Sequence, residues 1–195
     1  NPPEYNGFKI VLAGETLSGD SIQALRRRIE QADYLSGEGV LQDQNLVPDY
    51  LNRIDEDVRV ARPMRVVVDA GNGAAGAVLP ALLRAMGCEV VELFCEVDGD
   101  FPNHHPDPLR PENLVDLKET MRVEGADLGV AFDGDADRAF FIDEQLDPLP
   151  GSTVTAIVAR WFLARHPGST VVHNLICSRA VPESIIAAGG TPVRT

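Results

Sequence analysis

Cysteine is scarce in this sequence, which holds three in 195 residues, at Cys88, Cys95 and Cys177. An odd number without paired metal-site spacing argues against a disulfide-stabilised scaffold and against a cysteine-rich metal centre. All three lie in apolar stretches. We therefore expect buried free thiols and a reducing, cytoplasmic compartment.

Basic residues are also few, 17 against 30 acidic ones, so the net charge is −13. Such a charge opposes broad binding to nucleic acid or to an anionic membrane. No apolar run approaches the roughly 18 residues of a membrane-spanning helix, and no signal-peptide pattern opens the chain. Neither nucleic acid nor membrane is expected as a partner, and a phosphorylated ligand would need a local positive site.

What the sequence does contain is an ordinary globular composition, 44% hydrophobic and 24% charged. Short β-type runs alternate with helical periodicity, which predicts consecutive α/β domains. Strands are expected at residues 8–13, 65–69, 89–94, 126–132, 139–142, 170–173 and 192–194. Helices are expected from Asp20 or Ser21, over 47–58 as a link between two domains, over 74–86, from Pro111 to near Gly125, over 154–162 and over 182–188.

Chemically active side chains gather in the run DGDADR at residues 133–138, between two expected strands. Its three carboxylates, Asp133, Asp135 and Asp137, lie within five residues. They repel one another unless a cation compensates their charge, so a divalent metal is indicated. Oxygen ligands favour magnesium, calcium or manganese over zinc.

Three interpretations of this acidic loop compete. An EF-hand calcium loop would use Glu144 at its twelfth position, but Arg138 stands where glycine is needed, and strands flank the loop instead of helices. A phosphatase-like site would use Asp133 as nucleophile and Asp135 as acid, which leaves Asp137 and Arg138 without a role. A magnesium loop beside a phosphoryl group, with Arg138 binding the same phosphate, uses all four residues.

A glycine turn, GNGAAG at residues 71–76, has the spacing of the dinucleotide-binding fingerprint, and Glu92 lies where a ribose-binding acid is expected. Taken alone, these features suggest an NAD-binding dehydrogenase. A turn that only lets a helix and a strand pack closely gives the same letters, however. No second mononucleotide-binding half of matching length precedes the acidic loop, so the sequence favours a structural turn.

The stretch at residues 98–108 contains three prolines and cannot be a helix or a central strand. We expect an ordered loop. Its adjacent histidines, His104 and His105, point to opposite sides of an extended backbone and so make a poor metal pair. At least one of them is expected to fix the loop by a hydrogen bond.

Several segments together resemble one family. Residues 133–138 resemble the metal loop of the α-D-phosphohexomutases, and residues 1–9 resemble the second half of that family's phosphoserine motif. Residues 69–73, 96–108 and 190–193 resemble its bacterial phosphomannomutase/phosphoglucomutase branch. The resemblance runs along the whole chain.

The resemblance implies a phosphohexomutase-like fold, with consecutive α/β domains whose mixed sheets are covered by helices, truncated at both ends. Residues 1–43 would end the phosphoserine domain, 44–146 would form the metal-binding second domain, and 147–195 would begin the third. The implied activity moves a phosphoryl group between O6 and O1 of a hexose through a phosphoserine and a bisphosphorylated sugar. The motif's serine would precede Asn1, so this chain alone is expected to be inactive.

The resemblance also assigns site residues. Asp133, Asp135 and Asp137 would hold Mg²⁺, and Arg138 would contact the phosphoryl group. Lys9 would lie beside the attacking or leaving hydroxyl and shuttle its proton, although a surface lysine on a strand has the same appearance. The expected partner is a phosphorylated hexose, and the choice between mannose and glucose stays open. A non-catalytic metal-binding module and an NAD-binding domain stand as alternatives.

Overall fold

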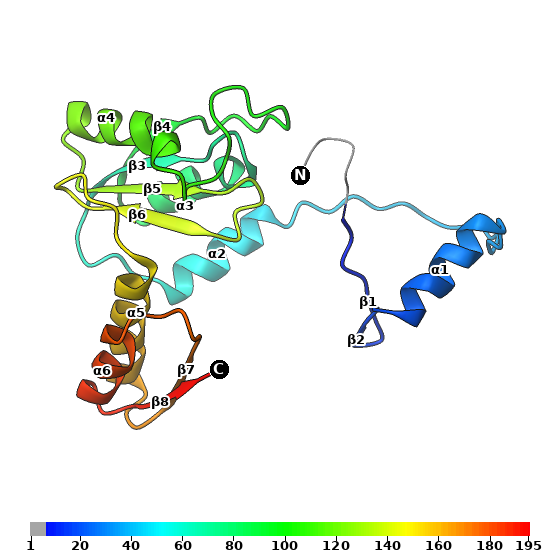
Figure 1. The fold of residues 1–195 in the computed structure, drawn as a ribbon. Coiled ribbons are helices and arrows are strands. Elements are labelled where there is room, and N and C mark those ends of the chain that lie inside the picture. The colour runs from blue at the N-terminus through cyan, green and yellow to red at the C-terminus, as the bar shows by residue number, and fades with distance from the viewer. Residues whose placement is uncertain (1–6) are drawn as a thin grey trace. The chain divides into compact units, whose positions relative to one another are not determined.

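The computed structural model describes residues 7–195. The chain divides into two compact units, Asn1–Leu46 and Val47–Thr195, which Figure 1 colours along the sequence. The segment expected to resemble a phosphoserine motif, residues 1–9, lies outside the described residues except for its last three positions.

Over its described residues, 7–46, the first unit contains a small hairpin and one helix. Strands β1 (Val11–Leu12) and β2 (Glu15–Thr16) pair antiparallel. The turn between them has positive φ at Ala13 and Gly14, as a two-residue hairpin turn requires. The strand expected over residues 8–13 is therefore wrong in extent, because the chain already reverses at its end. Helix α1 (Asp20–Glu30) begins where it was predicted and buries no residue.

The second unit opens with helix α2 (Val47–Asp57) and is built on a mixed sheet in the order β4-β3-β5-β6. Strands β3 (Arg65–Asp69), β4 (Glu89–Leu93) and β5 (Leu128–Phe132) are parallel, and β6 (Ala139–Ile142) is antiparallel to β5. These strands and the mixed sheet confirm the predicted α/β fold. Asp69 at the end of β3 pairs with Ala131 near the end of β5, so the loops after these strands share one edge of the sheet.

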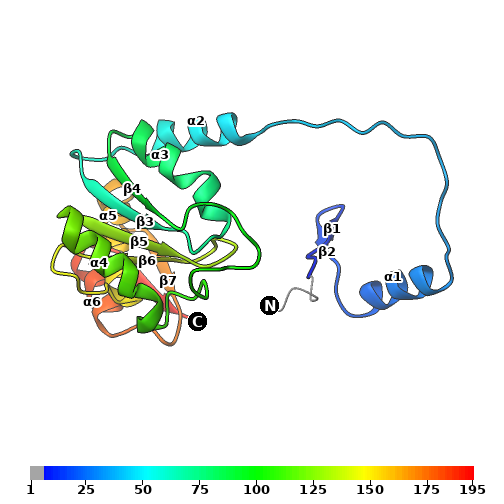
Figure 2. The same ribbon diagram turned by 90° about the horizontal axis from the view of Figure 1, so that it is seen from above.

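Helices cover both faces of this sheet (Figures 1 and 2). Leu117 and Met121 of α4 (Val115–Glu124) pack with Val67 on one face. On the other face, Leu79 and Leu83 of α3 (Leu79–Ala85) pack against Val66, Val68 and Val130. Burial of each such apolar side chain stabilises the fold by about 1.5–3 kcal/mol relative to exposure, which fixes the strand ends that carry the loops.

Two of the expected helices begin with a 3₁₀ turn. A 3₁₀ turn, η1 (Ala74–Ala77), precedes α3, because Pro80 lacks an amide hydrogen and is accommodated only in the first turn of a helix. A 3₁₀ turn, η2 (Pro111–Leu114), likewise precedes α4. Helix α4 ends at Glu124, close to the predicted end, and Gly125 caps it in the left-handed conformation.

A further α/β segment follows β6. Helix α5 (Gly151–Arg165) leads to β7 (Thr170–His173), and α6 (Ala180–Ala187) leads to β8 (Thr191–Arg194). Strands β7 and β8 pair in parallel, and α5 packs on α6 around Leu163 and Ile185. These elements match the helices and strands expected in this part of the chain, which belongs to the same compact unit as the four-stranded sheet.

The cysteines correct one expectation. All three are free, but only Cys88 is buried, whereas Cys95 and Cys177 are partly exposed. Burial, followed by the charge of Glu92, raises the pKa of the Cys95 thiol to about 11.

In the part of the chain that the structure describes, no helix combines the length and the apolar character needed to cross a membrane.

Candidate functional site

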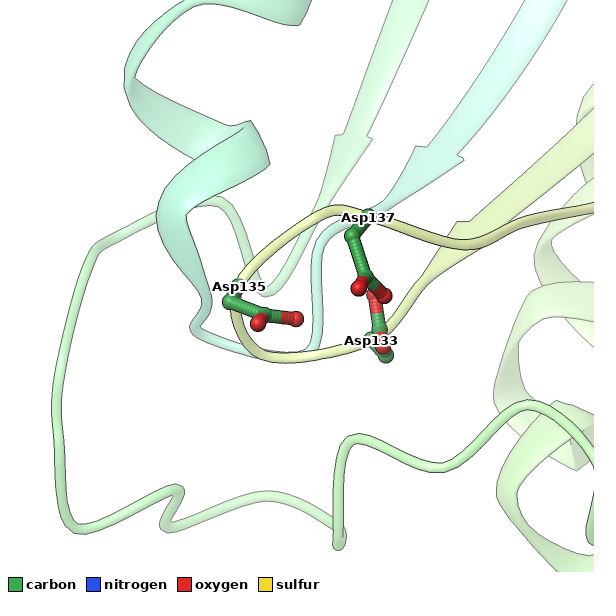
Figure 3. A group of neighbouring side chains, drawn as sticks. All are labelled: Asp133, Asp135 and Asp137. Atoms are coloured by element: carbon green, nitrogen blue, oxygen red, sulfur yellow. The ribbon is translucent and has the colours of Figure 1, made fainter. Parts of the chain in front are cut away.

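The acidic loop joins β5 to β6, and its carboxylates converge. One oxygen from each of Asp133, Asp135 and Asp137 lies within 4.8 Å of the others, and Figure 3 shows the three side chains turned toward one another. Asp133 is buried, with 1% of its surface exposed, whereas Asp135 and Asp137 are exposed. Between them the chain turns at Ala136, whose backbone has the left-handed conformation. The structure thus brings the three candidate ligands together in one loop.

Arg138 binds the buried carboxylate of the loop. Its backbone N–H donates to Oδ1 of Asp133 at 3.0 Å and its Nε donates to Oδ2 at 2.5 Å. Burial alone would raise the pKa of Asp133, but the hydrogen bonds and the charge of Arg138 hold it below its ordinary value. Asp133 is therefore ionised at neutral pH. Arg138 therefore supplies, from within the loop, part of the positive charge that the three carboxylates were expected to need.

Arg138 also has side-chain N–H donors that these hydrogen bonds do not use. Its side chain is 54% exposed, and Nε also lies 3.4 Å from Oδ1 of Asp137. Within residues 7–195, its terminal amino groups have no hydrogen-bond partner. Arg138 can therefore hold Asp133 and still present two N–H₂ groups to an anion beside the loop.

The glycine turn at residues 71–76 supports the acidic loop directly. The N–H of Ala74 donates to the carbonyl of Gly134 at 3.0 Å. A Cβ at Gly73 would lie 2.6 Å from the same oxygen, and a Cβ at Gly76 would lie 2.1 Å from the carbonyl oxygen of Cys95. Gly71 has a φ of +50°. Close packing at Gly73 and Gly76 and the positive φ at Gly71 thus explain why glycine occupies all three fingerprint positions.

Glu92, the residue expected to bind a ribose in the NAD interpretation, forms an ion pair with Arg84 at 2.6 Å.

The EF-hand interpretation is wrong, because strands β5 and β6 flank the loop where that motif needs helices. Lys9 lies in the first unit, where it is exposed. The structure therefore brings together four of the predicted site residues, Asp133, Asp135, Asp137 and Arg138. The fifth, Lys9, belongs to the first unit.

Replacing Gly73 by alanine should destabilise the second unit. The added Cβ must displace backbone atoms of the acidic loop, and overpacking of this kind costs about 1–3 kcal/mol of unfolding free energy. Urea unfolding followed by circular dichroism measures it. Gly99→Ala is the matched control, because a Cβ there meets no atom within 4 Å. Equal unfolding midpoints for the two variants would contradict the packing role of Gly73.

Comparison with known proteins identifies relatives of this chain. Residues 48–147 match the family model described as phosphoglucomutase/phosphomannomutase, alpha/beta/alpha domain II. A phosphomannomutase/phosphoglucomutase of Pseudomonas aeruginosa is 48% identical over 193 residues, which is 99% of this chain and 42% of the relative. A phosphoglucomutase of Neisseria meningitidis serogroup B is 39% identical over 195 residues, again 99% and 42%.

A solved structure shows the same similarity. A phosphoglucomutase/phosphomannomutase family protein from Burkholderia thailandensis superposes with a TM-score of 0.89 at 41% identity. The match covers 100% of this chain and 42% of that one. The chain therefore spans less than half the length of these relatives.

Proposed function

Because this chain belongs to the phosphoglucomutase/phosphomannomutase family, we propose that the longer protein containing it, the parent protein, is a hexose phosphate mutase. It would interconvert hexose 1-phosphate and hexose 6-phosphate through a phosphoserine, with Mg²⁺ held in the acidic loop. The observation that carries the proposal is the convergence of Asp133, Asp135 and Asp137 beside the half-exposed Arg138. Its substrate is a phosphorylated hexose.

The donor set fits a hard divalent cation. Three carboxylates offer oxygen ligands only, which suits Mg²⁺ and excludes a preference for soft metals. Asp133 accepts from Arg138 at both oxygens, but an ionised carboxylate has about four lone-pair sites, so metal and arginine can share it. When bound, Mg²⁺ would neutralise charge on the oxygens of the phosphoryl group during transfer.

The chain's own residues supply orientation and proton transfer in this proposal. In each transfer a P–O bond to one oxygen forms as the P–O bond to another breaks, and the attacking hydroxyl loses its proton. Arg138 would orient the phosphoryl group through its terminal amino groups. Lys9 would take up the proton from the sugar hydroxyl and return it to the leaving oxygen in the reverse step.

We also propose the three-domain division, with boundaries near residues 43 and 146. The compact unit beginning at Val47 and the family match over residues 48–147 support the middle domain. The third domain would begin with helix α5.

A phosphatase that uses Asp133 as nucleophile is less well supported. Asp133 is 1% exposed, and both of its oxygens accept hydrogen bonds from Arg138. A nucleophilic oxygen must approach phosphorus directly, whereas a metal ligand needs only one free lone pair. The geometry therefore favours a metal-holding role for this carboxylate.

A thermal-shift experiment on this chain separates the proposal from the NAD alternative. A ligand that binds only the folded state stabilises it by RT ln(1 + [L]/Kd), about 1.4 kcal/mol at ten times Kd. Mg²⁺ should raise the melting temperature, and NAD should leave it unchanged. A saturable shift of the melting temperature with NAD would instead promote the dehydrogenase interpretation.

A further inference from the structure

The proline-rich loop at residues 98–108 lies against the acidic loop. A Cβ at Gly134 would lie 3.3 Å from the ring of Phe101 and 3.4 Å from Cγ of Pro106. Gly134 therefore has the glycine turn on one side, through the hydrogen bond from Ala74, and these two rings on the other. The backbone between Asp133 and Asp135 is held from both sides.

This proline-rich loop contains no helix or strand. The N–H of Asp98 donates to the carbonyl of Asn72 at 2.9 Å, and side-chain hydrogen bonds hold the rest of the loop. Nε2 of His104 lies 3.1 Å from Oδ2 and 3.2 Å from Oδ1 of Asp69. Nδ2 of Asn103 donates to Oδ1 of Asn72 at 2.8 Å. The ring of His104 also packs edge-on against Phe94, with centroids 5.3 Å apart. The prediction that a histidine fixes this loop is confirmed, and the residue is His104.

Asp69 is the anchor of this arrangement. It ends β3, is 1% exposed, and accepts the N–H of Gly71 at 2.9 Å in addition to the imidazole. It is not one of the three clustered carboxylates. A buried carboxylate that loses its hydrogen-bond partner destabilises the fold, so we expect the bond between Asp69 and His104 to persist.

We propose that His104 is a positioning residue for the metal loop. Through Asp69 it keeps Phe101 and Pro106 pressed on Gly134, and this fixes the spacing between the carboxylates on either side of that glycine. His104 itself touches neither metal nor substrate. The proposal rests on the proposed metal-binding function of the loop, but the position of the loop can be measured without metal.

The test compares His104→Ala with His105→Ala on this chain. His105 is exposed, so it is a matched control for loss of an imidazole in the same loop. Hydrogen exchange is followed at the amides of Ala74 and Arg138, which donate to Gly134 and to Asp133. Calorimetric titration with Mg²⁺ gives the affinity. Residues that orient metal ligands from outside typically contribute 10–100-fold in affinity.

We expect His104→Ala to weaken Mg²⁺ binding about tenfold, the low end of that range, and to speed exchange at Ala74 and Arg138. The amides of β3 should keep their protection, and His105→Ala should match the wild type. His104→Gln should recover most of the loss, because its amide nitrogen can still donate to Asp69. Recovery by glutamine distinguishes positioning from simple packing.

Unchanged affinity and unchanged exchange in His104→Ala would overturn the proposal. If that variant does not fold, Phe101→Ala replaces it. This variant leaves the His104 bond in place and removes the ring from Gly134, and wild-type exchange at Ala74 and Arg138 would count equally against the proposal. If the wild type gives no Mg²⁺ heat, the proposed metal function fails, and the exchange data alone still decide whether His104 positions the loop.

Discussion

Asp135→Asn should abolish measurable Mg²⁺ binding by this chain. The wild type should bind weakly, because the three carboxylates of the loop fill only part of the octahedral shell that Mg²⁺ prefers. Removal of one of three carboxylate charges should weaken binding by at least the 10–100-fold typical of outer-shell losses. Asp135 is exposed, so the fold should persist. Isothermal titration calorimetry measures the change.

Asp116→Asn is the control for this experiment. It makes the same substitution at an exposed aspartate in the first turn of α4, outside the acidic loop. Its heats should match those of the wild type. Equal heats for Asp135→Asn and the wild type, or a clear preference of the wild type for zinc over magnesium, would contradict the metal assignment.

The second large effect concerns turnover. We predict that a polypeptide of these 195 residues has no measurable mutase activity, whereas the parent protein converts mannose 1-phosphate and mannose 6-phosphate with Mg²⁺. Covalent phosphoryl transfer needs its nucleophile, and the serine of the phosphoserine motif that residues 1–9 resemble has no counterpart in this sequence. In the proposed mechanism, Lys9, Arg138 and the metal then have no phosphoserine to act on.

A coupled assay on three polypeptides measures this prediction: the chain alone, the chain with its upstream segment, and the parent protein. The second should stay far below the third, because binding energy from the remote phosphate orients the reacting centre. Appreciable turnover by the chain alone would place the nucleophile within these residues. The phosphatase interpretation with Asp133 as nucleophile would then lead.

The sequence predicted most of the second unit because its signals are local. The apolar runs of β3 and β5 and the carboxylates between β5 and β6 are each readable within a few residues. Parallel neighbours in a sheet bring their carboxyl ends together, so the meeting of the glycine turn and the acidic loop follows from topology.

Other features of the site depend on contacts that a linear pattern does not show. The loop in which Arg138 bonds back to Asp133 contains a left-handed residue at Ala136, a conformation that alanine does not signal. The pairing of Asp69 with His104 joins residues 35 positions apart. Its only sequence signal was a histidine in a loop too rich in proline to be held by backbone bonds alone.

The proposed mutase activity is tested most directly by ³¹P NMR of the parent protein with mannose 1-phosphate, with and without Mg²⁺. We predict that the mannose 6-phosphate resonance appears only with Mg²⁺, that total sugar phosphate stays constant, and that Asp135→Asn suppresses the conversion. Release of inorganic phosphate in place of mannose 6-phosphate, or conversion that is indifferent to Mg²⁺ and to this substitution, would contradict the account.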